Sequence, residues 1–241
     1  MASKEINYKD YTFTISYELV NPKEKKSILI LHGWGSNKEI MRQAFGKSMP
    51  EYRHIYIDMP GFGKSSNEIV LETQDYADII RVFLDSIRAD IDIAMGHSFG
   101  GKVSTLLNPP TLVLLSSSGI LVPKELAVRA KIALFKILKP LGVSKLHQLF
   151  ISDDAKGMSQ NMYETFKIVV NERFEENFTK VDSDTLLFWG ESDTATPLWS
   201  GEKIANMIKN SRLYPLEGDH FFFLKHSDFI AEKISNIYKE Q

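Results

Sequence analysis

One serine in the sequence is flanked by glycines at a spacing that is typical of a catalytic nucleophile. The pentapeptide at positions 96–100 reads Gly-His-Ser-Phe-Gly and directly follows the apolar run 91–95. A strand that turns sharply through G-x-S-x-G into a helix is a nucleophile elbow, which lifts the serine hydroxyl clear of the strand end. On its own the pentapeptide also fits a glycine-rich turn without chemistry. Because the strand and helix context favours the elbow, we predict Ser98 as a nucleophile, with the Phe99 N–H at a helix N-terminus facing a developing oxyanion.

A serine hydroxyl needs a base to remove its proton, and a histidine oriented by a carboxylate is the usual base. Three histidines follow Ser98 in the chain. His147 lies in a segment predicted to be a helical insertion, and His226 lies near the last predicted helix. His220 comes directly after a predicted strand, in a loop. We therefore predict His220 as the base.

The carboxylate is expected in the loop 190–197, which also follows a predicted strand. Asp193 is the predicted acid, because the proline that closes this loop at a helix start places it over the crevice. Glu191 is the competitor within the loop. Asp219 adjoins His220, but adjacent residues in an extended loop point apart. The end of another predicted strand, at 111–115, offers only serines.

The elements that must position these residues alternate along the first half of the chain. We predict, in order, a strand pair at 5–8 and 11–19, and then strands and helices at 27–31, 38–49, 54–58, 73–88, 91–95 and 111–115. Thr73 is the predicted N-cap of its helix. This order implies a parallel sheet with right-handed crossovers and helices on both faces. Ligands bind such sheets at the carboxyl ends of the strands, where Ser98 falls.

The pattern changes in the second half. Two prolines after Asn108 end the helix that follows Ser98 within about ten residues. Residues 120–181 are predicted to be a helical cap insertion, with helices at 121–141 and 159–178, and the core domain then comprises residues 1–119 and 182–241. The alternation returns with a strand, a helix, a strand and a helix at 185–189, 197–209, 212–216 and 229–239.

Composition excludes several other classes of function. Of the 241 residues, 43% are hydrophobic and 25% are charged, and the formal net charge is −2, so nothing indicates a nucleic-acid partner. The chain has no cysteine, which excludes disulfides, thiolate chemistry and cysteine-ligated metals within it. No apolar run approaches the roughly 18 residues of a membrane span, and the first residues lack the apolar stretch of a signal peptide. We expect a cytoplasmic protein with neither metal nor cofactor.

Taken in chain order, five motifs resemble those of the α/β-hydrolase superfamily, in its serine carboxylesterase and meta-cleavage-product hydrolase branch. They are His32-Gly33-Trp34-Gly35, Asp58-Met59-Pro60-Gly61-Phe62-Gly63-Lys64-Ser65, Gly96-His97-Ser98-Phe99-Gly100-Gly101, Trp189-Gly190-Glu191-Ser192-Asp193 and Gly218-Asp219-His220-Phe221. The resemblance covers nearly all of the chain outside the cap. It implies the α/β-hydrolase fold, which is a mostly parallel, twisted sheet with helices on both faces and a helical cap insertion.

The same resemblance implies a role for each site residue. Ser98 would be the nucleophile, His220 the base and later the acid, and Asp193 the orienting carboxylate. The backbone N–H groups of Trp34 and Phe99 would form the oxyanion hole. No metal or cofactor is implied.

The resemblance also bounds the function. It gives Asp58 and His97 structural roles, and a serine nucleophile argues against haloalkane dehalogenase or epoxide hydrolase chemistry. We expect a serine hydrolase that cleaves the carboxylic ester of a small or medium acyl substrate, similar to esterases of pimeloyl-carrier-protein methyl esters. The alternatives are a carbon–carbon bond hydrolase of a meta-cleavage-type dienoate and a weakly catalytic, ligand-binding homologue.

The first half of the predicted cap is basic. Only Glu125 opposes six cationic residues: Lys124, Arg129, Lys131, Lys136, Lys139 and Lys145. The first interpretation is a helix whose lysines face water beside an apolar stripe. The alternative is a docking surface for an acidic partner such as an acyl carrier protein, whose attached chain would enter beneath the cap.

Overall fold

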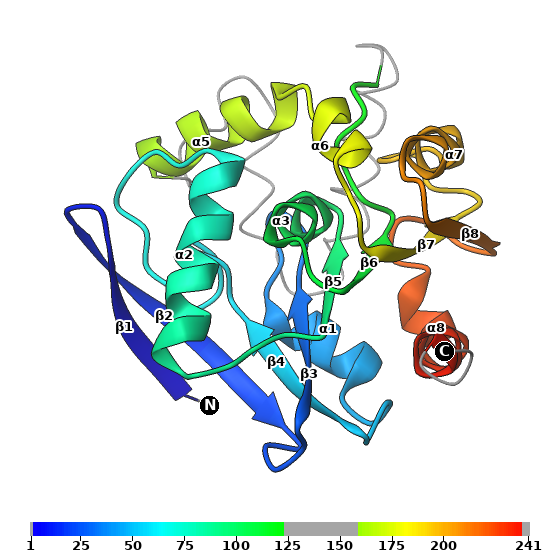
Figure 1. Cartoon of the computed structure of the whole chain (residues 1–241). Helices are drawn as coiled ribbons and strands as arrows, with labels where there is room; N and C mark the ends of the chain where they lie inside the picture. Colours follow the sequence, from blue (N-terminus) through cyan, green and yellow to red (C-terminus); the bar gives the residue numbers. More distant parts are fainter. Residues whose placement is uncertain (1, 123–158, 238–241) are drawn as a thin grey trace.

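The computed structural model describes residues 2–122 and 159–237, and within these ranges eight strands form a single sheet (Figure 1). The strands are β1 (Ala2–Tyr8), β2 (Tyr11–Val20), β3 (Lys26–Leu31), β4 (Tyr52–Ile57), β5 (Ile93–His97), β6 (Thr111–Leu115), β7 (Asp184–Gly190) and β8 (Ser211–Leu216). Their order across the sheet is β1-β2-β4-β3-β5-β6-β7-β8. β1, β2 and β4 pair antiparallel, and all pairs from β4 onward are parallel. The predicted mostly parallel α/β sheet is confirmed.

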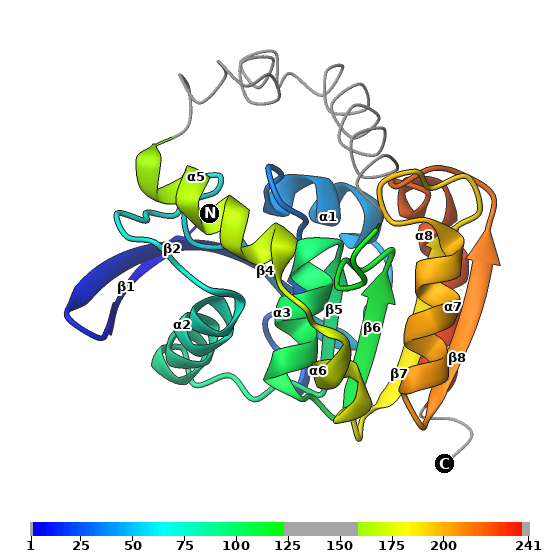
Figure 2. The same cartoon turned by 90° about the horizontal axis from the view of Figure 1, so that it is seen from above.

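Helices cover both faces of this sheet. They are α1 (Lys38–Phe45), α2 (Thr73–Ser86), α3 (Phe99–Leu107), α5 (Gln160–Asn171), α6 (Glu175–Thr179), α7 (Leu198–Met207) and α8 (Phe223–Ile237). Figures 1 and 2 show α1 and α8 on one face and α2, α3 and α7 on the other. Within β3, Ile28 and Ile30 belong to the core on the first face, and Leu29 and Leu31 to the core on the second. Because both faces are covered, residues 28–31 of this strand are all apolar.

The end of α1 and the N-cap of α2 differ from the predicted ones. α1 ends at Phe45, short of the predicted end, and its last backbone hydrogen bond runs from the Gly46 N–H to the carbonyl oxygen of Arg42. The predicted N-cap at Thr73 is wrong. Glu72 is the N-cap of α2. Its side chain accepts a hydrogen bond from the backbone of α2, and the side chain of Asp75 accepts the Glu72 N–H, which together form a capping box.

The helix that follows Ser98 is short, as predicted. α3 ends at Leu107, where Asn108 adopts a left-handed conformation with φ 50°. Asparagine tolerates this conformation at a helix end, and the prolines that follow cannot continue the helix. α8 begins at Phe223, earlier than predicted, and its two helical pieces meet at His226, whose φ of −114° and ψ of 17° are not helical.

The described part of the segment between β6 and β7 contains two helices where one was predicted. The spacing of residues 159–178 is helical throughout, but α5 ends at Asn171 and Glu172 is extended, with φ −65° and ψ 132°. Phe174, which follows, is completely buried before α6 begins. The predicted helix at 121–141, including its basic residues, lies outside the described residues, so the cap and its boundaries remain predictions.

A buried lysine explains where α5 stops. Lys102 extends from α3, and its Nζ lies 2.5 Å from Glu172 Oε2 and 2.8 Å from the carbonyl oxygen of Val169, near the end of α5. The ammonium also lies 4.9 Å from the centre of the Phe174 ring. The Thr73 hydroxyl donates to the same Glu172 oxygen at 2.5 Å. One ion pair therefore joins α2, α3 and the C-terminal end of α5.

Candidate active site

Ser98 lies between β5 and α3 in a strained backbone conformation, with φ 52° and ψ −115°. Its N–H donates to the carbonyl oxygen of Leu115 at 3.1 Å, and its own carbonyl oxygen accepts the Ser118 N–H at 3.1 Å. The turn is so tight that a Cβ atom on Gly96 would lie 2.2 Å from the carbonyl oxygen of Gly100. The serine side chain itself is only half-buried. This geometry is that of the predicted elbow.

The structure brings the predicted base and acid into contact. His220 Nδ1 lies 2.7 Å from Asp193 Oδ2, and both side chains are buried. The carboxylate is an acceptor, so Nδ1 carries the proton in this contact and Nε2 of the neutral ring has a lone pair. Among the described residues, His220 Nε2 has no hydrogen-bond partner. Asp193 thus orients the ring through Nδ1, and the lone pair of Nε2 can accept a proton.

The backbone of its own loop holds the Asp193 carboxylate. Oδ1 accepts the N–H groups of Ala195 and Thr196 at 2.8 and 2.9 Å, and the Thr196 hydroxyl lies 2.9 Å from Oδ2. Burial raises the pKa of this carboxyl, but His220 and these donors outweigh burial and hold the pKa below its ordinary value. Asp193 is therefore ionised at neutral pH.

A serine from another strand also supports the acid. Ser116 comes directly after β6, and its hydroxyl bonds the Asp193 carboxylate. The hydroxyl oxygen of Ser116 also lies 3.4 Å from the Gly190 nitrogen, and the serine backbone has a φ of 43°. Sequence reasoning noted only serines at this strand end and gave them no role, because nothing local indicates that β6 and β7 lie side by side there.

The competing residues take other partners. Glu191 is exposed, and the exposed Asp219 accepts the N–H of Phe221 at 2.9 Å. His226 Nε2 lies 2.8 Å from the carbonyl oxygen of Glu217. His147 is outside the described residues.

His97 connects the serine and histidine segments. Its Nε2 lies 2.9 Å from the backbone carbonyl oxygen of His220, so this nitrogen carries the proton, and the two rings are 4.5 Å apart. Burial, together with the nearby His220, lowers the pKa of His97 well below its ordinary value. A Cβ atom on Gly33 would lie 2.9 Å from His97 Nδ1 and 3.1 Å from Ser98 Cβ. The loop that carries Trp34 therefore approaches both residues closely.

The two predicted oxyanion donors lie in segments that adjoin Ser98. Phe99 is the first residue of α3, so its N–H has no acceptor within the helix. The Trp34 ring packs edge-on against Phe99 at 5.4 Å and against Phe62 at 4.8 Å, and it also contacts Phe166 of α5 at 5.3 Å. These ring contacts join the Trp34 loop to α3 and α5.

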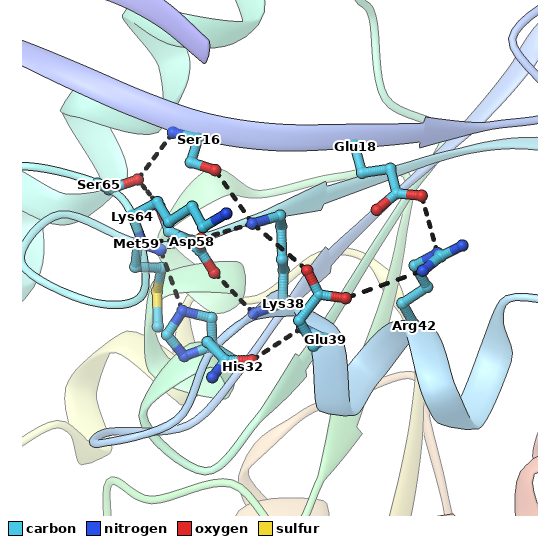
Figure 3. A network of polar contacts seen from close by, with 11 residues as sticks. Ser16, Glu18, His32, Lys38, Glu39, Arg42, Asp58, Met59, Lys64 and Ser65 are labelled. Atoms are coloured by element: carbon cyan, nitrogen blue, oxygen red, sulfur yellow. Dashed lines mark hydrogen bonds and ion pairs between the residues drawn. The ribbon is translucent and has the colours of Figure 1, made fainter. Parts of the chain in front are cut away.

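Asp58 lies on the loop that follows β4, beside the Trp34 loop, in the network of Figure 3. Its Oδ1 accepts the Lys38 N–H at 2.8 Å, and its Oδ2 accepts the Lys64 N–H at 3.0 Å. The Lys38 ammonium lies 2.6 Å from the same Oδ2. These contacts agree with the predicted loop-shaping role of Asp58. Sequence reasoning did not single out Lys38, since a lysine at a helix start is ordinarily solvated.

Across residues 2–122 and 159–237 no group of histidine, aspartate and glutamate side chains could hold a metal ion. In the same ranges no helix combines the length and the apolar character that crossing a bilayer requires.

Comparison with known proteins finds relatives that align with most of this chain. The chain is 25% identical to the uncharacterized hydrolase YugF of Bacillus subtilis, over 93% of this chain and 94% of that one. It is also 25% identical to a pimeloyl-[acyl-carrier protein] methyl ester esterase of Neisseria meningitidis, over 87% of this chain and 76% of that one. A thermophilic esterase of Thermogutta terrifontis has the same fold, with a TM-score of 0.75 and 15% identity over 100% of this chain and 99% of that one.

A family model described as the alpha/beta hydrolase family matches residues 28–233, which span the serine, aspartate and histidine segments. The match runs from β3 through most of α8, so it includes the strands β3 to β8 and leaves out β1 and β2. The chain belongs to the α/β-hydrolase family.

Proposed function

We propose that this chain is a serine hydrolase that cleaves a carboxylic ester through an acyl-enzyme intermediate. The observation that carries the proposal is the 2.7 Å contact between His220 Nδ1 and Asp193 Oδ2, with no partner for His220 Nε2 among the described residues. A histidine held in this way can accept a proton at Nε2. Ser98, half-buried at the elbow, is the hydroxyl that would supply the proton.

The reaction follows from these roles. Ser98 Oγ attacks the acyl carbon while His220 Nε2 takes the hydroxyl proton, and the carbonyl oxygen becomes an oxyanion that the Trp34 and Phe99 N–H groups stabilise. The bond to the alcohol then breaks, and His220 gives its proton to the leaving oxygen. Water attacks the acyl-enzyme with His220 again as the base, which releases the carboxylic acid and restores the serine.

The surroundings of His220 suit the positive charge that it carries in both steps. The Asp193 carboxylate lies 2.7 Å from Nδ1 and is ionised. His97 is the neighbouring ring, and its pKa is lowered well below the ordinary value, so it stays neutral and does not repel the imidazolium.

For the substrate we propose a small or medium acyl ester held between the core and a cap formed by residues 120–181. The aromatic contact between Trp34 and Phe166 supports an apolar acyl chain at this boundary. The name of the Neisseria relative supports a carrier-linked methyl ester as one candidate. Docking of an acyl carrier protein would depend on the basic residues that lie outside the described part of the chain.

A fluorophosphonate probe tests the proposal. It should label the wild-type chain at Ser98 and should not label Ser98→Ala, while p-nitrophenyl esters of increasing chain length give the preferred acyl size. Turnover that persists in purified Ser98→Ala would overturn the proposed nucleophile. A preference for a meta-cleavage-type dienoate over every ester would instead indicate carbon–carbon bond hydrolysis. Labelling of Ser98 without turnover of any of these substrates would favour the ligand-binding alternative.

A further inference from the structure

The loop that carries Trp34 is fastened at both ends to the loop that follows β4. At its start, His32 Nε2 accepts the Met59 N–H at 3.0 Å. At its end, Lys38 contacts Asp58 through both its backbone N–H, at 2.8 Å, and its ammonium, at 2.6 Å. Figure 3 shows the two attachments beside each other. The path of the Trp34 loop is therefore set by its neighbour in the sheet.

The attachment at Lys38 is a buried ion pair. The Lys38 and Asp58 side chains are each 1% exposed. The ammonium has a second close partner in the Ser16 hydroxyl, at 3.0 Å on β2, and the Glu39 carboxylate lies farther away at 3.8 Å. Although burial disfavours the charged carboxylate, its contacts with Lys38 and the Lys64 N–H hold the pKa of Asp58 below the ordinary value. A buried ammonium that lost this carboxylate would have no comparable partner.

Helix α1 does not need this ammonium in order to form. Its N-cap is Asn37, whose side chain already accepts the Glu39 N–H at 3.0 Å. The helix also has a tie to β2 on its solvent side, where Arg42 Nε lies 2.8 Å from Glu18 Oε1. The contribution that is specific to Lys38 is the position of the loop end relative to β4.

We propose that Lys38 and Asp58 form a positioning pair for the oxyanion site, which fixes the Trp34 N–H at the distance that the tetrahedral intermediate requires. Neither side chain touches the substrate in this scheme, and the inference rests on the proposed function. An oxyanion donor acts only from a narrow range of positions, and a displacement of about 1 Å costs up to about 100-fold in rate.

Lys38→Met tests the pair, with Arg42→Met as the matched control on the same helix. We expect Lys38→Met to lower kcat about 10-fold to 100-fold with KM within about twofold. Affinity for an alkyl trifluoromethyl ketone, whose adduct with Ser98 carries an oxyanion, should fall by the same factor. Arg42→Met should change neither quantity by more than about twofold. Unchanged kcat and unchanged ketone affinity in folded Lys38→Met would overturn the proposal, as would a rise in KM alone.

Two further measurements separate this pair from folding and from the proposed function. The double variant Lys38→Met/Asp58→Asn buries no unpaired charge, so it should be more stable to heat than Asp58→Asn alone while retaining the loss in kcat. Full recovery of kcat in the double variant would contradict the pair. The NMR resonance of the Trp34 amide needs no turnover, and Lys38→Met should shift it while Arg42→Met leaves it in place. If the wild-type chain takes no fluorophosphonate, the proposed function fails, whereas an unmoved Trp34 amide refutes the pair alone.

Discussion

Two buried aspartates in this molecule have similar backbone contacts but different side-chain partners. Asp58 and Asp193 each follow a parallel strand, accept two backbone N–H groups, and contact one nitrogenous side chain through Oδ2. The partner of Asp58 is a lysine whose ammonium has no acceptor lone pair. The partner of Asp193 is His220, whose second ring nitrogen has no hydrogen-bond partner in the described chain. A carboxylate with similar contacts thus fastens a loop in one place and, in the proposed mechanism, orients the base in the other.

The largest effect should follow from removing the acceptor. We expect His220→Ala to lower kcat/KM for a p-nitrophenyl ester by on the order of 10³-fold or more, as for the loss of other members of such triads. The fold should persist, because the change leaves Asp193 with its other donors. Far-ultraviolet circular dichroism checks the fold, and His226→Ala is the control, which should stay within about threefold. A larger loss in His226→Ala than in His220→Ala would assign the base to the wrong histidine.

Replacement by asparagine should lower mainly the stability at Asp58 and mainly the activity at Asp193. Asp58→Asn leaves the Lys38 ammonium buried beside a neutral amide, so we expect the free energy of unfolding in urea to fall by about 3 kcal/mol. Asp193→Asn should cost little stability, since His220 can stay neutral. Its kcat/KM should fall strongly, but about 10-fold to 100-fold less than in His220→Ala.

Glu191→Gln is the control for the acid. A lower activity in Glu191→Gln than in Asp193→Asn would show that the wrong carboxylate was chosen. Equal losses of stability in Asp58→Asn and Asp193→Asn would remove the distinction between the two aspartates.

Acid should destabilise the fold before the aspartates are protonated. Burial lowers the pKa of His32 to about 4, and the pKa values of His54 and His97 are lowered too. As the pH falls below the ordinary value of about 6.5, the unfolded chain binds protons that the folded chain does not, so stability is lost. For His32 alone the loss by pH 4 is about 3 kcal/mol. Asp58 and Asp193 have lowered pKa values, so their contributions to the free energy of unfolding are lost only below about pH 4. Equal urea midpoints at pH 7 and pH 5 would contradict this order.

The smallest effect concerns His97, whose Nε2 donates to the carbonyl oxygen of His220 at 2.9 Å. Glutamine can place an amide N–H near that position, and methionine has a similar length without a donor. We expect His97→Met to lower kcat about 10-fold, with His97→Gln recovering most of the loss and KM little changed in both. If the two variants are equally impaired, the hydrogen bond to His220 is not what holds the base.

Much of this site could be predicted from local sequence because its three members follow strand ends. The glycines around Ser98 mark a tight turn, and the search for loops that follow predicted strands narrows the choice of acid and base to a few residues. The alternation of apolar runs with segments of helical spacing predicts the parallel sheet, and this pattern can also be recognised from local sequence. Each of these signals is local, because it can be recognised within a short stretch of the chain.

Lys38 and Ser116 could not be found in that way. The burial of Lys38 depends on the sheet order β2-β4-β3, which brings Ser16 and Asp58 to it from two other strands. The contact between Ser116 and Asp193 depends on the pairing of β6 with β7. The break after α5 has the same origin, because residues 159–178 are helical by spacing and their interruption coincides with the contact to Lys102.

The junction at Lys102 has a consequence for exchanging parts between relatives. The ammonium is almost wholly enclosed, so the core presents a fixed cation to whatever insertion is placed over it. A transplanted insertion would need an acidic side chain at the position of Glu172 and a free carbonyl oxygen at the position of Val169, near the end of α5. Lys102 therefore limits which insertions could replace the present one without loss of stability. A chimera that lacks these partners would leave the Lys102 ammonium buried and unpaired, one helical turn from Ser98.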